Sequence, residues 1–355
     1  MIEAQADLAG RIQHNDAFIR FALEMVTTSL GLKGLRDFQG NHAKSRTAAT
    51  LMSLFYQSAA EARCYHVSKD MCALIQHAAA GLDETDLVEF YDLAPTNYGL
   101  VRFDGGGLEV IDPRGEVMKL DWLLWGDCAF VVDNDPDNMH NDTVVPRRSE
   151  RITAEGFSVW EFNDRVDNPD GISLAIAEQV PTKGLNDALG RWNIMGNHVV
   201  QTGTEVGPAM LMATGLQRES ILARGEQPVP ATNTLRLLHA FWLLLQQPIT
   251  EEDIARLTGP ARKAAKAKGV KRAQADRDVS VIDIRKAARQ AKPADSDGTK
   301  RHVEWRGQWI VNGFWRWQAY GPGRKQRKRI WVDGFVKGPA DLPLIKRKHV
   351  YTVKG

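Results

Sequence analysis

Cysteine, long apolar runs and secretory features are all scarce in this sequence. Only three of its 355 residues are cysteine: Cys64, Cys72 and Cys128. So small and odd a number argues against a disulfide scaffold and fits a reducing compartment. The most apolar stretch, near residues 237–245, is too short to span a bilayer. Residues 1–16 contain no basic segment followed by an apolar one, so we expect no secretory signal and a cytoplasmic location.

The motifs of common enzyme classes are also missing. The sequence has no GxxxxGK[ST] phosphate loop, no GxSxG nucleophile elbow and no HExxH zinc motif. Gly105-Gly106-Gly107 lies between two expected strands and does not open a helix, as a dinucleotide fingerprint would. We therefore predict no cofactor, and a non-enzymatic role is favoured over an enzymatic one.

Two groups of metal-ligating residue types do not have the spacing of a metal site. One group holds two thiols and two imidazoles, the ligand set of tetrahedral zinc: Cys64, His66, Cys72 and His77. Their spacing, CxHx5Cx4H, fits no zinc pattern, and a helical segment with Cys72 in a core is the simpler interpretation. An acidic run over residues 133–137 lacks the glycine and glutamate of a calcium loop. We predict no metal site.

Charge is distributed very unevenly along the chain. Residues 254–355 contain 26 Lys and Arg against 8 Asp and Glu, a net charge of +18. Residues 1–253 contain 20 basic and 36 acidic residues, a net charge of −16. This asymmetry is typical of a polyanion-binding part joined to an acidic part. The alternative is that the two parts neutralise each other across an internal interface.

Hydrophobic periodicity predicts an α+β fold. Residues 1–97 have apolar residues at helical spacing and form a mainly helical region. Residues 98–230 alternate apolar and polar residues between glycine turns. They form an α+β domain with an antiparallel sheet and helices on one side. Strands are expected near residues 100–104, 108–110, 117–124, 130–132 and 157–162.

Residues 231–290 form a mainly helical segment and a candidate winged helix-turn-helix. A strongly apolar helix before Pro248 must be buried. Thr250 followed by three acids predicts the start of a short helix to residue 257. A third helix over residues 261–268 would be the recognition helix, with Arg262, Lys263 and Lys266 reaching DNA, before a strand at residues 279–284. An ordinary solvated alanine-lysine helix is the competing interpretation.

The C-terminal residues combine positive charge with aromatic side chains. Residues 291–300 are a polar linker, and residues 301–355 form a small, basic, tryptophan-rich β module. Strands are expected within residues 305–317, 329–336 and 349–353. We expect most of the odd-numbered tryptophans, including Trp315 and Trp317, to form the core of this module. Tyr320 is the better candidate for an exposed stacking group.

Two segments resemble a known group of proteins. DLAPTNYGLVRFDGGGLEVIDPRGEV with WLLWG, and WIVNGFWRWQAYGPGRKQRKRIWVDGFVKGPADLPL, resemble the N- and C-terminal patterns of uncharacterised proteins of actinobacteria, their plasmids and their phages. The resemblance covers most of the chain and implies a mobile-element or phage gene in a bacterial cytoplasm, with no assigned activity. Where that pattern has a histidine before Trp315, this chain has Phe314.

These features predict a non-enzymatic nucleic-acid-binding protein, with DNA favoured over RNA, no membrane association and an oligomeric state left open. Cations would neutralise phosphates, and Tyr320 would stack on bases. The predicted contacts in the C-terminal third are Tyr320, Arg324, Lys325, Arg327, Lys328, Arg329, Lys346, Arg347 and Lys348. One alternative is a nuclease or RNA-targeting toxin that uses Asp121, Glu161 and Asp164, or His302 and His349. Another is a factor that docks on an acidic protein.

Overall fold

The structure is a computed structural model, and it describes most of residues 1–284 and part of the C-terminal third. The described residues are 1–29, 42–83, 85–111, 117–131, 143–145, 154–164, 192–205, 234–247, 250–256, 260, 263, 278–284, 309–311 and 313–337. The helices described up to residue 284 are α1 (Ile2–His14), α2 (Asp16–Ser29), α3 (His42–Glu61), α4 (Lys69–Ala80), α5 (Phe90–Leu93) and α9 (Thr234–Leu245). The strands there are β1 (Arg63–Val67), β2 (Leu87–Val88), β3 (Tyr98–Phe103), β4 (Leu108–Ile111), β5 (Val117–Leu120), β6 (Trp122–Val131), β7 (Thr143–Val145), β8 (Ala154–Asp164), β9 (Trp192–Gln201), β10 (Thr204–Glu205), β11 (Thr250–Ala255) and β12 (Val279–Ile284).

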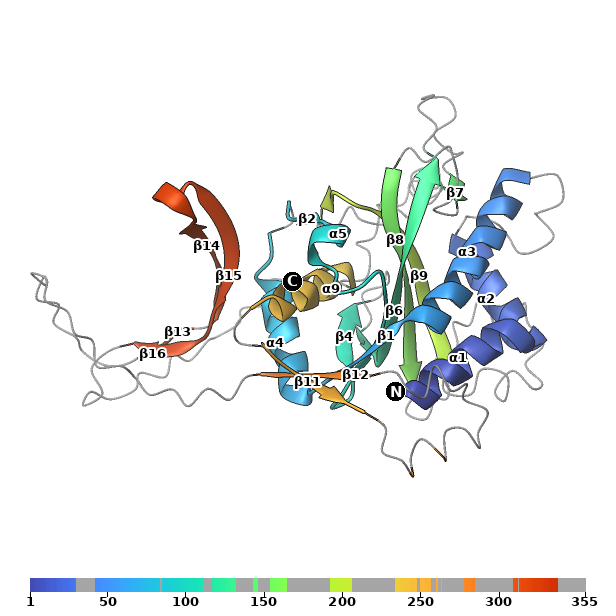
Figure 1. The fold of residues 1–355 in the computed structure, drawn as a ribbon, viewed down its shortest axis with the longest axis horizontal. Helices are drawn as coiled ribbons and strands as arrows, with labels where there is room; N and C mark the ends of the chain where they lie inside the picture. Colours follow the sequence, from blue (N-terminus) through green and yellow to red (C-terminus); the bar gives the residue numbers. More distant parts are fainter. Residues whose placement is uncertain are drawn as a thin grey trace, which may run out of the picture. The chain divides into compact units, whose positions relative to one another are not determined.

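A mixed sheet organises this part of the chain (Figure 1). Its strand order is β11-β12-β1-β3-β6-β8-β9, and β7 pairs with β6. β1 runs parallel to both of its neighbours, β12 and β3, whereas the other described pairs of the sheet are antiparallel. The α+β class is confirmed, but the predicted antiparallel sheet is only partly right, because its centre contains three parallel strands.

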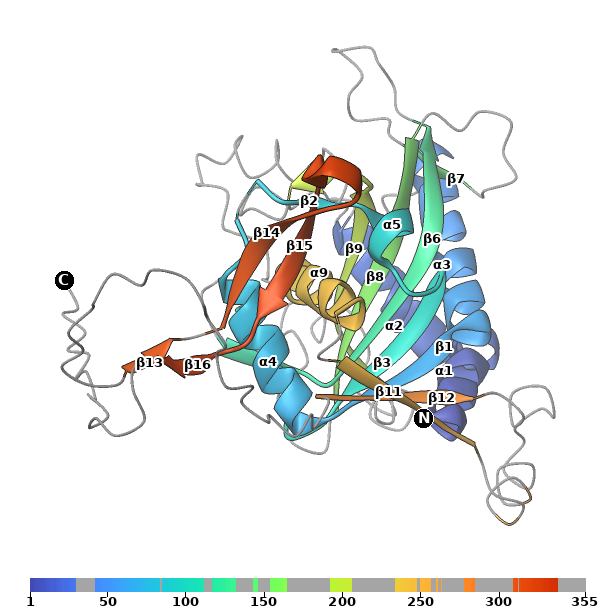
Figure 2. The ribbon, with the colours of Figure 1, turned by 60° about the vertical axis from the view of Figure 1, so that its left-hand side comes forward.

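Helices cover both faces of this sheet, which both ribbon views show (Figures 1 and 2). On one face α1, α2 and α3 bury aromatic side chains of β6, β8 and β9. There Phe55 stacks on Trp160, with ring centroids 3.8 Å apart. On the other face Trp242 of α9 lies 5.8 Å from Trp125 of β6, centroid to centroid. The expectation of helices on one side only is therefore wrong. The prediction of a buried helix before Pro248 is confirmed, because α9 is almost wholly buried.

The segment at residues 250–255 is a strand, and the short helix predicted there is wrong. β11 pairs antiparallel with β12, from Thr250 opposite Ile284 to Ala255 opposite Val279. Arg63 of β1 donates to Glu252 of β11 at 2.7 Å. An acid that in the sequence resembles a helix-start signal therefore forms an ion pair near the edge of the sheet. The three-helix order behind the winged helix-turn-helix prediction is thus absent from the described residues. Lys263 is helical and exposed, and the rest of residues 261–268 lies outside them.

The chain divides into two compact units, residues 1–284 and residues 285–355. The second unit is described over two pairs of antiparallel strands. β13 (Trp309–Val311) pairs with β16 (Phe335–Lys337), and β14 (Phe314–Tyr320) pairs with β15 (Gln326–Val332). The strands predicted within residues 305–317 and 329–336 are present in these pairs. The linker at 291–300 and the strand predicted at 349–353 lie outside the described residues.

Candidate functional site

Six of the seven described Lys and Arg residues of the second unit lie on one β-hairpin, β14–β15, which the ribbon draws in orange-red (Figure 1). A short turn, η4 (Pro322–Arg324), joins the strands. Gly321 and Gly323 have φ of 74° and 64°, which glycine adopts without steric cost. Arg324 has φ of 55°, an uncommon conformation for a residue with a Cβ. The Gly-Pro-Gly sequence thus reverses the chain tightly and places a cation at the tip.

Cations outnumber carboxylates strongly on this hairpin. Residues 314–332 contain six Lys and Arg and no acid, and the next residue is Asp333. Arg324, Lys325, Arg327 and Lys328 are all exposed. Among the described residues of this unit, none of these four has a carboxylate within 4.0 Å of its charged group. Four predicted phosphate-binding residues are therefore brought together at one end of the hairpin with their charge uncompensated locally.

Aromatic side chains of β14 lie beside cations of β15. The strand register puts Trp317 opposite Arg329, and the Arg329 guanidinium lies 5.1 Å from the centre of the Trp317 ring system. Lys328 lies 5.4 Å from the centre of the Tyr320 ring. Such cation–π contacts orient long cationic side chains along the ribbon. The predicted exposure of Tyr320 is confirmed, since its exposed fraction is 42%.

Most of the odd-numbered tryptophans are expected to lie in a core, and Trp317 is one that does not, because its exposed fraction is 58%. Trp315 and Trp331 do pack together, with ring centroids 5.1 Å apart, and Trp331 is buried. Sequence alternation puts Trp315 and Trp317 on one face, but it does not tell how far a covering layer reaches. The other predicted contacts, Lys346, Arg347, Lys348, Arg262 and Lys266, lie outside the described residues.

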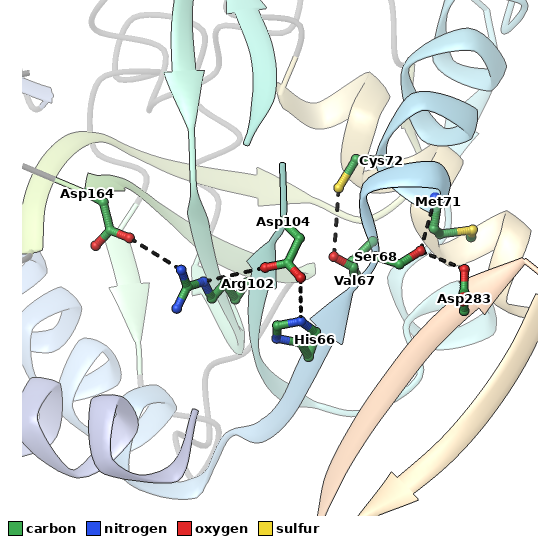
Figure 3. A network of polar contacts seen from close by, with 9 residues as sticks. All are labelled: His66, Val67, Ser68, Met71, Cys72, Arg102, Asp104, Asp164 and Asp283. Carbon is green, nitrogen blue, oxygen red and sulfur yellow. Dashed lines mark hydrogen bonds and ion pairs between the residues drawn. The ribbon is translucent and has the colours of Figure 1, made fainter. Parts of the chain in front are cut away.

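A second polar cluster lies where the parallel strands β12, β1 and β3 end (Figure 3). His66 Nε2 is 2.7 Å from Asp104 Oδ2. Arg102 lies between two carboxylates, 3.9 Å from Asp104 and 3.9 Å from Asp164. Its guanidinium also lies 5.2 Å from the centre of the Trp122 ring system. Open sheets often bind ligands at the edge where parallel strands end. The sequence alone does not identify this cluster, because the alternation of apolar and polar residues does not show which strands run parallel.

The start of α4 lies in the same cluster, where its N-cap residue Ser68 contacts β12. Ser68 Oγ accepts from the amide of Met71 at 3.3 Å as the N-cap and donates to Asp283 at 2.7 Å. The backbone amide of Asp104 donates to the carbonyl of Val67 at 3.0 Å. These bonds tie the ends of β1, β3 and β12 together. The cluster therefore has a structural task, which accounts for its polar residues without a ligand.

The three acids proposed for a nuclease lie in two different environments. Asp121 accepts from the backbone amide of Asp164 at 2.7 Å, so these two are neighbours. Glu161 is buried and lies 2.8 Å from His198 Nε2 of β9. Burial lowers the pKa of His198, but the charge of Glu161 and its hydrogen bond outweigh burial and raise the pKa overall. His302 and His349 lie outside the described residues.

The cysteines and histidines considered for zinc are divided between a strand and a helix. Cys64 and His66 belong to β1, whereas Cys72 and His77 belong to α4. The thiol of Cys64 donates to Gln5 at 3.3 Å, and burial raises the pKa of Cys72 to about 12. Within the described ranges, no group of three or more Cys, His, Asp or Glu side chains is arranged to hold a metal ion.

Comparison with protein-family models, curated proteins and solved structures gives no match to this chain. In the part of the chain that the structure describes, no helix is both long enough and apolar enough to cross a membrane. The geometry of the hairpin and the charge of the sequence around it are therefore the features of this chain that point to a function.

Proposed function

We propose that this chain is a non-enzymatic nucleic-acid-binding protein that holds the phosphate backbone with the β14–β15 hairpin. The observation that carries the proposal is the group of four exposed cations described above, which have no carboxylate within ion-pair distance among the described residues. Phosphate groups spaced along a backbone match cations spaced along a strand. Each phosphate neutralised releases a counterion, which favours binding at low salt.

The aromatic residues favour nucleic acid over an acidic protein as the partner. A polyacidic surface would need only the cations, whereas nucleobases also offer flat faces to exposed rings. Trp317 and Tyr320 each lie beside a cation of the same hairpin. Backbone contacts of this kind set position and affinity without reading sequence. Lys346, Arg347 and Lys348 would supply further phosphate contacts.

The biological setting is part of the proposal and comes from the sequence resemblance alone. The two segments similar to proteins of actinobacterial plasmids and phages favour a mobile-element protein acting in a bacterial cytoplasm, with DNA as the first ligand to test. A regulatory role would follow if the protein prefers particular sites. Winged helix-turn-helix contacts through Arg262, Lys263 and Lys266 are not needed for the hairpin to bind.

A gel-shift or fluorescence-anisotropy series over salt concentration tests the proposal directly. Single-stranded DNA, duplex DNA and RNA of equal length serve as probes for the full chain. Binding should weaken steeply with salt. The triple variant Arg327→Ala, Lys328→Ala, Arg329→Ala should lose most of the affinity and reduce the slope of log K against log salt by about 2 to 3.

A matched control comes from the first unit of the same chain. Arg20→Ala removes an exposed cation from α2 and should leave affinity and salt slope unchanged. Binding that is absent, or independent of salt, contradicts the proposal. A triple variant that binds as well as the parent moves the interface away from the hairpin. Degradation of a probe during incubation with Mg²⁺ would favour the nuclease alternative instead.

A further inference from the structure

Trp317 is the most exposed aromatic side chain among the described residues of the hairpin, although tryptophan is costly to leave in water. Its exposed fraction is 58%, against 42% for both Phe314 and Tyr320. The Arg329 guanidinium lies over the ring system at 5.1 Å and so shields part of one ring face. More than half of the side chain still contacts solvent, so a flat ligand can reach the ring system.

The residues that share a face of the hairpin with Trp317 change from apolar at one end to cationic at the other. Alternate residues of a strand share a face, so Trp315, Trp317 and Ala319 lie in one row of β14. The register places Trp331, Arg329 and Arg327 opposite them in β15. One end of this face is the packed Trp315–Trp331 pair, and the other end carries a small alanine beside Arg327. Trp317 thus lies between an apolar base and two cations.

We infer that this face is a binding site for an unpaired nucleobase, which stacks on Trp317 while Arg327 and Arg329 hold the adjoining phosphates. The inference rests on the proposed function and narrows it to single-stranded nucleic acid, with single-stranded DNA as the probe. In a duplex, both faces of each base are covered by its neighbours, so an exposed ring gains little there. In a single strand a base can turn outward, and stacking on an aromatic ring is tolerant of sequence.

Stacking requires an aromatic ring at position 317, whereas purely electrostatic binding does not. Trp317→Leu keeps an apolar side chain but removes the ring, and Trp317→Phe restores a smaller ring. Phe314→Leu is the matched control, because Phe314 is also an exposed aromatic of β14 but lies on the other face, at the strand's first residue.

Affinity of the full chain and of these variants for an oligothymidylate and for a duplex of equal length provides the test. Trp317→Leu should weaken oligothymidylate binding by about tenfold or more. Its effect on duplex binding, like that of Phe314→Leu on both probes, should stay within about threefold. Trp317→Phe should recover most of the loss, and the salt slope should stay that of the parent because no cation is removed.

The outcomes separate this inference from the proposed function. Equal losses on oligothymidylate and duplex, or no recovery in Trp317→Phe, overturn stacking while phosphate binding by the hairpin stands. A reduced salt slope in Trp317→Leu also overturns it, because Trp317 would then act only by orienting Arg329. If the parent chain binds neither probe at low salt, the proposed function fails and this inference fails with it.

Discussion

At the scale of single residues, the buried charged pair of Glu161 and His198 should affect stability more than the ion pairs on the surface do. Glu161 has an exposed fraction of 1%, and His198 is the basic group beside it at 2.8 Å. A carboxylate buried on a strand is costly unless a partner compensates its charge. Sequence reasoning grouped Glu161 with Asp121 and Asp164 as scattered acids, because nothing in its neighbours along the chain reveals a partner 37 residues away.

His198→Gln should destabilise the protein by about 2 to 4 kcal/mol below neutral pH, because it takes the positive charge away from buried Glu161. The pKa of His198 is raised above its ordinary value of 6.5 in the folded state. The charged pair therefore contributes fully below about pH 6.5 and is lost as pH rises through the raised pKa. Urea unfolding of parent and variant across this pH range measures the difference, which should shrink with rising pH.

The control for this experiment is His14→Gln, which changes an exposed histidine of α1. It should leave the free energy of unfolding close to that of the parent at every pH. A cost of His198→Gln that stays constant from acid to alkaline pH would show that His198 contributes by packing or by a neutral hydrogen bond.

At the scale of elements, the sequence predicts best where local periodicity and tertiary packing agree. The apolar run of α9 and the alternation in β3 and β8 are such cases, whereas the strands expected at residues 117–124 and 130–132 are β5 and the single longer strand β6. β1 escapes prediction, because its five residues follow a long helix and its parallel partners are distant in sequence. β11 is wrongly predicted, because a capping signal is local whereas pairing with β12 is not. An edge strand rich in acids is a common defence against aggregation.

Close contact between β3 and β6 gives a prediction at the same scale. A Cβ on Gly99 would lie 2.0 Å from a carbon of the Trp125 ring, which is fully buried. Trp125 cannot move freely, because its Nε1 donates to the carbonyl of Thr96 at 2.9 Å. Gly99→Ala should therefore cost about 1 to 3 kcal/mol or more of unfolding free energy through overpacking.

Gly10→Ala is the matched substitution, because a Cβ there meets nothing within 4 Å and Gly10 lies in α1. It should stabilise the protein by about 0.5 to 1 kcal/mol, as alanine favours the helix. Thermal or urea unfolding of both variants gives the comparison. Equal effects of the two substitutions would contradict the described fit of Gly99 against Trp125.

At the scale of the whole molecule, the chain joins an acidic unit to a basic one. Residues 1–284 contain 28 basic and 39 acidic residues, a net charge of −11, and residues 285–355 contain 18 and 5, a net charge of +13. Among the residues after 284 whose side-chain burial the structure describes, the buried hydrophobic residue is Trp331. The first unit thus has its own core. The uneven charge of the sequence was enough to predict the candidate site on the basic hairpin, whereas the exposure of Trp317 is known only from the structure.

A protein ending at residue 284 separates binding from mutual neutralisation of the two units. We expect it to fold, with a cooperative urea transition and near-ultraviolet circular dichroism like the parent's first unit, because its described core is contained within residues 1–284. It should lose nucleic-acid binding, since a net charge of −11 repels phosphates. An unfolded product would mean that the basic residues stabilise the acidic unit, and they would then be occupied by its carboxylates. Retained binding would place the interface in the first unit. Only a folded protein without affinity agrees with nucleic-acid binding through the basic hairpin.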